Sequence, residues 1–197
     1  MKSLNGLEVL SCLTQKKLRI FSPEEFRRVF GVSLCASQQF IESHRSDLFV
    51  KLRNGLYALR SNLPAETEIA NRLYTPSYLS LEYALAHYRM IPETVYSVTS
   101  VTTRTTRTFI AEGRSYDYSR IKLNAFTGYR SLKTEAGVIL IAEPEKALVD
   151  YLYFVDLRLK PLNDRLYLKG KVSRAAVMCF AKLFGRSSLI DLVGKVL

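Results

Sequence analysis

Tryptophan is absent from this sequence, and cysteine and histidine are scarce, with three cysteines and two histidines in 197 residues. The cysteines, Cys12, Cys35 and Cys179, are odd in number, widely separated and without a CxxC pair, which argues against a disulfide framework and against a zinc site. We therefore expect buried or half-buried thiols, and we expect neither a bound metal nor another cofactor.

Long hydrophobic runs are also missing. A membrane-spanning helix needs about 18 or more consecutive apolar residues, and no stretch of the sequence approaches that length. The first residues, MKSLNGLEVLSCL, are too short and too polar for a signal peptide. A cytoplasmic location without membrane contact is therefore expected.

Acidic residues are few relative to basic ones. The chain has 29 Lys and Arg against 18 Asp and Glu, which gives a net charge of +11. The apolar fraction of 48% is ordinary for a globular protein, so charge is the unusual property. Such an excess favours a polyanionic partner, with nucleic acid as the first candidate and an acidic membrane as the second.

Catalytic patterns are not found either. His44 and His87 are expected on helices beside apolar residues, where histidine is more often structural than catalytic. No glycine-rich phosphate loop or nucleophile and histidine arrangement occurs, so we expect no enzyme and no catalytic residue. One alternative stays open, because Glu143, Glu145 and Asp150 follow an apolar strand and could bind a metal for nuclease or phosphate-transfer chemistry. A helix dipole also favours Glu at a helix start, which explains the first two without a metal.

The N-terminal third has local signals for three helices and a hairpin. Leucines at three-residue steps indicate the first helix. Ser22 opens the run SPEE, which matches a capping box with proline at the first helical position. A glycine turn follows that helix, and Ser33 is expected to cap the next one. Asn54-Gly55 is a strong hairpin signal. The expected elements are a helix over 4–16, a short strand over 19–21, a helix over 23–30, a helix over 34–45 and a hairpin over 48–60.

This order predicts an α+β protein with two domains. Two helices joined by a glycine turn and followed by a basic hairpin are typical of a winged helix-turn-helix, which we expect over residues 1–62. A mixed α/β domain is expected over residues 63–197, with the boundary near Pro64. Four of its expected helices cover residues 65–74, 78–88, 173–184 and 187–196, and a fifth starts at residue 143. Its expected strands lie at residues 94–103, around 109–110, at 117–123 and at 137–142.

The third helix of the first domain is the expected reader of DNA bases. Its outward face carries Gln38, Gln39 and Glu42 beside Cys35; glutamine can pair with adenine, and glutamate can accept from cytosine. Ser33, at the helix N-terminus, is expected to contact a phosphate. The other expected contacts surround the motif or lie on the hairpin: Arg27, Arg28, Arg45, Lys51, Arg53 and Asn54. A winged helix that binds only protein partners would display similar residues.

A second nucleic-acid surface is possible in the larger domain. The segment TTRTTRTFIAEGR interleaves threonines with Arg104, Arg107 and Arg114, and hydroxyl and guanidinium groups together can hold phosphates. An exposed edge strand would look the same. Both domains are basic, because residues 1–62 hold 10 Lys and Arg against 5 Asp and Glu, and residues 63–197 hold the remaining 19 against 13.

The chain resembles the AbiEi antitoxin family, the antitoxin halves of bacterial type IV toxin–antitoxin and abortive-infection systems. The resemblance lies in LRNGLYAL, in TPSYLSLEYALAHYRMIP with the Val- and Thr-rich segment after it, and in VILIAEPEKALVDYLYF. These stretches have the order and spacing of that family over most of residues 1–155. The matching positions are Arg53, Asn54, Gly55, Tyr57, Pro76, Ser77, Tyr78, Ser80, Ala84, Pro144, Lys146, Ala147 and Asp150.

The resemblance implies a winged-helix domain that represses its own operon by binding inverted repeats in promoter DNA. It also implies a C-terminal domain that neutralises a nucleotidyltransferase-like toxin, with which the antitoxin need not form a stable complex. The hairpin turn often reads RRG or RKG in that family, whereas this chain has Arg53-Asn54-Gly55, which lowers the charge of the hairpin.

Overall fold

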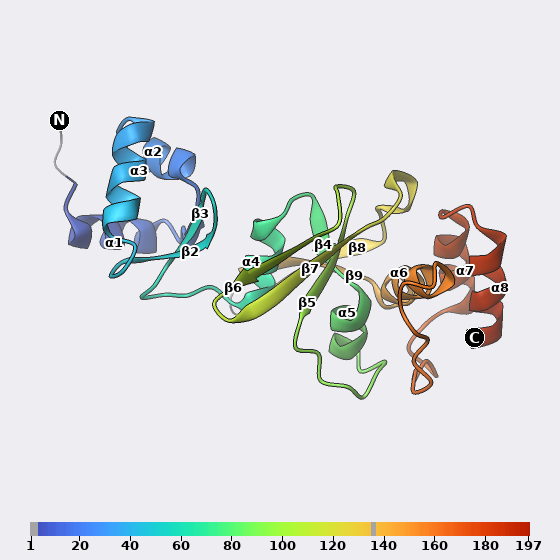
Figure 1. Ribbon diagram of the computed structural model, residues 1–197. Helices are drawn as coiled ribbons and strands as arrows, with labels where there is room; N and C mark the ends of the chain where they lie inside the picture. Colours follow the sequence, from blue (N-terminus) through green and yellow to red (C-terminus); the bar gives the residue numbers. More distant parts are fainter. Residues whose placement is uncertain (1–3, 135–136) are drawn as a thin grey trace.

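A computed structural model describes residues 4–134 and 137–197 of the chain. The described residues form a mixed α+β structure with eight α-helices and two sheets. Figure 1 shows the N-terminal elements at one end, the larger sheet in the middle and the last helices at the other end, so that α1 and α8 lie far apart. Within these residues, no helix is both long enough and apolar enough to cross a membrane.

The N-terminal elements follow the local signals of the sequence closely. Ser22 caps the second helix in a complete capping box with Glu25, and Gly31 ends that helix in the left-handed conformation with φ of 66°. Ser33 caps the third helix. The three strands pair antiparallel in the order β1-β3-β2. The elements are α1 (Gly6–Gln15), β1 (Ile20–Phe21), α2 (Pro23–Phe30), α3 (Leu34–Ser43), β2 (Phe49–Arg53) and β3 (Leu56–Leu59).

Both faces of the β2–β3 hairpin are covered. Tyr57 and Leu59 face a small core in which α1, α2 and α3 meet the aromatic rings of Phe21, Phe26 and Phe49. The alternate residues of β3 pack against the large core of the second sheet. The hairpin is therefore held between the N-terminal helices and the rest of the molecule.

The second sheet has six strands in the order β6-β7-β5-β4-β9-β8, with β4 parallel to β9 and β5 parallel to β7. Helix α4 covers one face, where the Tyr118 hydroxyl donates to the carbonyl of Ala70 at 2.5 Å. Helices α5 and α6 cover the other face, and α7 and α8 pack on α6. The elements are α4 (Glu66–Leu73), β4 (Ser77–Leu79), α5 (Leu81–His87), β5 (Val98–Thr102), β6 (Arg107–Ala111), β7 (Arg114–Arg120), a 3₁₀ turn (Leu123–Ala125), β8 (Tyr129–Thr134), β9 (Gly137–Ala142), α6 (Pro144–Asp156), α7 (Arg174–Lys182) and α8 (Ser187–Val196).

Two expectations about the second sheet were wrong, and one of its strands was not predicted. The helix expected from residue 78 does not begin there, because residues 77–79 form strand β4, which is hydrogen bonded between β5 and β9. Strand β7 begins at Arg114, so the preceding turn is centred on Glu112 and Gly113. Strand β8 was not predicted, since its residues are mostly polar and exposed at the edge of the sheet.

Two of the three cysteines also differ from the expectation of buried or half-buried thiols. Cys12 is half-buried, but Cys35 and Cys179 are exposed. Both exposed thiols lie on the solvent side of their helices, opposite Ile41 on α3 and Val177 on α7. All three are free thiols.

Helix α4 connects the two sheets. Its Glu68 accepts from Arg19 at 2.5 Å, and its Arg72 pairs with Glu25 at 2.7 Å. The carbonyl of Leu73 at its end accepts from Arg53 of the hairpin at 2.7 Å. Because these contacts add to the apolar packing of the hairpin, α4 fixes the N-terminal elements against the six-stranded sheet.

Candidate nucleic-acid interface

The outward face of α3 is polar and open to solvent. Cys35, Gln38, Gln39 and Glu42 are all exposed, as the helical periodicity predicts. On the inner side, the Ser37 hydroxyl is fully buried and donates to backbone carbonyls of α2 and α3. The two glutamines form no side-chain hydrogen bond within the described residues. Their amides are therefore free to contact a ligand.

Glu42 has a role in the structure that the sequence did not predict. The hydroxyl of Tyr57 on β3 donates to its carboxylate at 2.6 Å, and Arg45 approaches at 3.4 Å. The Tyr57 hydroxyl holds the pKa of Glu42 below its ordinary value, and burial together with Glu42 raises the pKa of Tyr57 to about 12. Glu42 thus ties α3 to the hairpin through one carboxylate oxygen, and its other oxygen faces the exposed Arg45.

Tyr57→Phe should raise the pKa of Glu42, because the lost phenol is the main group that holds it down. A carboxyl group whose pKa is lowered by folding stabilises the protein at pH values above its ordinary pKa, and this stabilisation is lost as the pH falls. The free energies of unfolding of wild type and variant should therefore converge in acid. Carboxyl-detected NMR titration measures this pKa. As a control, Tyr83→Phe removes a phenol that donates to Glu66 and should leave Glu42 unchanged. No shift in Tyr57→Phe would contradict the link between α3 and the hairpin.

Ser33 lies at the N-terminus of α3. Its hydroxyl oxygen accepts from the amide of Ala36 at 3.1 Å, so the side chain serves first as the helix cap. The residue is exposed, and the first amides of any α-helix point outward without a partner in that helix. A phosphate could meet the Ser33 hydroxyl and these amides together, as expected from the sequence.

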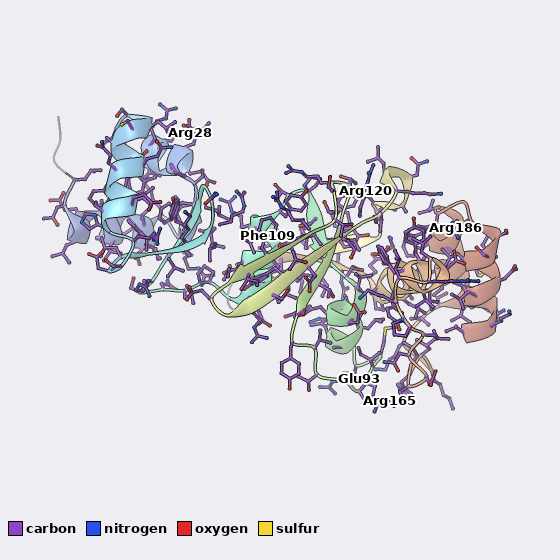
Figure 2. All side chains as sticks on the ribbon, viewed as in Figure 1. Arg28, Glu93, Phe109, Arg120, Arg165 and Arg186 are labelled. Carbon is purple, nitrogen blue, oxygen red and sulfur yellow. The ribbon has the colours of Figure 1, made fainter. Side chains whose placement is uncertain are left out.

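The arginines around α2 and α3 are largely paired with acids. Arg27 and Arg28 both contact Glu24, at 2.5 Å and 3.4 Å; in Figure 2, Arg28 lies on the outer side of the N-terminal elements. Arg45 contacts Glu42, as described above. On the hairpin, Lys51 is exposed and forms no ion pair with any described residue. The N-terminal elements therefore present less free positive charge than their composition indicates.

Arg53 bridges the tip of the hairpin and the end of α4. Its Nε donates to the carbonyl of Leu73, and its Nη1 donates to the carbonyl of the exposed Asn54 at 2.8 Å. Burial and the nearby charge of Arg104 lower the pKa of the Arg53 guanidinium. Arg53 thus closes the hairpin onto α4, in addition to any contact with a ligand.

The three arginines predicted as a second surface do not stay together. Arg114, at the far end of the β6–β7 hairpin, pairs with Glu66 at 2.9 Å. Arg104 lies 4.5 Å above the centre of the Tyr74 ring, and Arg107 lies 5.4 Å above that of Phe109. Figure 2 shows Phe109 at the edge of the sheet that faces the N-terminal elements. Arg104 and Arg107 therefore lie on the same surface as Arg53, whereas Arg114 lies elsewhere.

The acids of the alternative metal site are also separated. Asp150 is fully buried, and its carboxylate accepts from Lys146, from Ser80 at 2.8 Å and from Tyr78 at 3.0 Å. Glu145, in the first turn of the same helix α6, is outside this network and accepts from the backbone amide of Ser173 at 3.0 Å. Within residues 4–134 and 137–197, no three His, Cys, Asp or Glu side chains gather as metal ligands do.

The buried cluster around Asp150 unites two stretches of the sequence. Tyr78 comes from β4, Ser80 follows that strand at the start of α5, and Lys146 and Asp150 come from α6. The family resemblance marks all four positions without giving them a chemistry. The Lys146 ammonium also lies 4.8 Å from the centre of the Phe184 ring. Because all the polar members are buried, the cluster has no access to a ligand in this conformation.

Comparisons with known proteins bear on the fold. No family model matches the chain, and no curated protein matches it. Among solved structures, the chain is similar to the RV2827C protein from Mycobacterium tuberculosis, with a TM-score of 0.55 and 16% sequence identity, over 96% of this chain and 77% of that one. At this identity the likeness shows a shared fold, which extends over nearly the whole described chain.

Proposed function

We propose that this protein is a DNA-binding transcriptional regulator whose residues 1–62 act as a winged helix-turn-helix. Helix α3 would lie in the major groove, and the β2–β3 hairpin would contact the backbone. The observation that carries the proposal is the exposed face of α3, where Gln38 and Gln39, in the middle of the helix, have free amides. The exposed Lys51 of the neighbouring hairpin supplies positive charge.

The role of an AbiEi-type antitoxin is the more specific form of this proposal. It rests on the three resembling stretches of the sequence, two of which contribute the side chains around Asp150. In that role the protein would bind inverted repeats in its own promoter and neutralise a nucleotidyltransferase-like toxin, with residues 63–197 as the neutralising domain. A neighbouring reading frame for such a toxin would support this role, and its absence would favour a regulator that acts alone.

The metal-dependent nuclease or phosphate-transfer role is less well supported. It needs the carboxylate of Asp150 to face solvent, but this group is fully buried and engaged by three donors. The separate positions of Glu143 and Glu145 give it no further ligand nearby. DNA binding without chemistry is therefore the function that the geometry favours.

DNA binding is tested on the duplex upstream of the coding sequence and on a mixed-sequence duplex, by fluorescence anisotropy over a salt series. Gln38→Ala should reduce the preference for the upstream duplex by about 1–3 kcal/mol if its amide reads a base, and should leave the salt slope unchanged. Lys51→Ala should instead weaken binding to both duplexes and reduce the slope by about 0.9. Gln15→Ala, at an exposed glutamine on α1, is the matched control. Wild-type protein that binds neither duplex would overturn the proposal.

A further inference from the structure

A hollow lies where the hairpin meets the edge of the six-stranded sheet. Its volume is about 490 Å³, which is within the usual range for small-ligand sites. Three segments far apart in the sequence line it: Leu52, Arg53 and Asn54 of the hairpin; Tyr74 after α4; and Arg104 with residues 107–110 of the β5–β6 loop and β6. Figure 1 shows β6 as the edge strand nearest the N-terminal elements.

The lining of this hollow is strongly positive. It contains three arginines, Arg53, Arg104 and Arg107, and no carboxylate. None of the three forms an ion pair with a residue that the structure describes. Arg53 and Arg104 donate to main-chain carbonyls, and Arg107 forms no side-chain hydrogen bond with a described residue. Because a guanidinium has five N–H donors, most of these donors are free.

Aromatic rings orient two of the guanidiniums. Arg104 stacks on Tyr74, whose hydroxyl is itself fixed by the carbonyl of Thr105 at 3.1 Å. Arg107 lies over Phe109 on the same edge strand. Stacking covers the flat face of a guanidinium and leaves its N–H edges available for hydrogen bonds to an anion. The hollow therefore has ordered donors before any ligand enters.

Like charges are held close together in this hollow. The pKa of Arg53 is lowered first by burial and then by the charge of Arg104, with a further contribution from Arg107. A bound anion would reduce this repulsion and would interact with all three side chains at once. Phosphate groups suit such a site, because arginine binds their oxygens through two parallel hydrogen bonds.

We infer that the Arg53, Arg104 and Arg107 hollow is a phosphate-binding site that links the hairpin to the six-stranded sheet. The phosphate belongs either to a DNA backbone that extends beyond the hairpin or to a free ligand with a di- or triphosphate group. The DNA form of the inference rests on the proposed function, and the free-ligand form does not.

The test measures both sources of phosphate with full-length protein. Inorganic pyrophosphate and ATP are titrated by calorimetry, and a mixed-sequence DNA duplex is titrated over a salt series. Arg107→Ala removes an exposed side chain without a hydrogen bond, so its fold should persist. Arg104→Ala with Arg107→Ala is the stronger variant. Arg114→Ala, at an arginine of the same β6–β7 hairpin outside the hollow, is the matched control.

The outcomes separate the possibilities. If DNA supplies the phosphate, the salt slope should fall by about 0.9 in Arg107→Ala and by about 2 in the double variant, with no change in Arg114→Ala. If a free ligand supplies it, pyrophosphate or ATP binding should be lost in the same two variants. Variants that keep both the wild-type slope and wild-type binding would overturn the inference. If wild type binds no duplex, the proposed function fails, and the pyrophosphate and ATP titrations alone decide the site.

Discussion

Asp150→Asn should lower the free energy of unfolding by about 3–5 kcal/mol, although the two side chains differ little in size. Asp150 is the counter-charge of Lys146, and both are fully buried between the sheet, α6 and α7. The asparagine oxygen can still accept from Tyr78 and Ser80. The main loss is therefore the ion pair, which leaves the ammonium of Lys146 buried without a counter-charge. Urea denaturation measures the change.

The matched variant removes both charges. Lys146→Met together with Asp150→Asn should be more stable than Asp150→Asn alone, because no unpaired charge is left in the core. Burial lowers the pKa of Lys146, and a lowered lysine pKa reduces stability as pH falls. The loss in free energy of unfolding caused by Asp150→Asn should therefore become smaller as the pH rises toward the ordinary pKa of lysine. Additive effects of the two changes, or a cost below about 1 kcal/mol, would contradict this account of the pair.

The sequence predicted the elements whose signals are local. The capping box at Ser22, the glycine that ends α2 and the turn at Asn54-Gly55 each depend on residues within a few positions of one another. All three occur in the structure where the sequence places them. The turn before β7 shows the limit of such signals, since the strand begins at Arg114, three residues earlier than expected.

Elements that depend on distant partners could not be predicted. The sequence predicts a helix from residue 78, but residues 77–79 form a strand because β5 and β9 supply hydrogen bonds on both sides. Strand β8 lacks apolar alternation, and its pairing with β9 alone defines it. In both cases tertiary contacts override the local preference.

The residues of the candidate site also fall into those that local sequence patterns identify and those that only the tertiary structure brings together. The exposed face of α3 follows from helical periodicity, so Gln38 and Gln39 could be identified from the sequence. Arg53 and Arg104 lie 51 positions apart, and no sequence pattern shows that they line one hollow. The partner of Glu42 was missed for the same reason, since Tyr57 reaches it across the fold.

Gly128→Ala should be strongly destabilising, with an expected loss of about 2–5 kcal/mol. Gly128 has a φ of 74°, a left-handed conformation that side chains disfavour by about 1–2 kcal/mol. A Cβ atom there would also lie 2.6 Å from the ring of Phe180 on α7 and 3.0 Å from Cγ of Lys146. Crowding of this kind typically adds about 1–3 kcal/mol.

Gly113→Ala isolates the first of these two effects. Gly113 has a φ of 73°, but a Cβ atom there would meet nothing within 4 Å. The difference between the two alanine variants in urea denaturation therefore measures the contact with Phe180 and Lys146. Phe180→Leu should recover part of the loss in Gly128→Ala and none of the loss in Gly113→Ala, because only the first site meets that ring. Equal losses at the two glycines would contradict the close approach of Phe180 and Lys146 to Gly128.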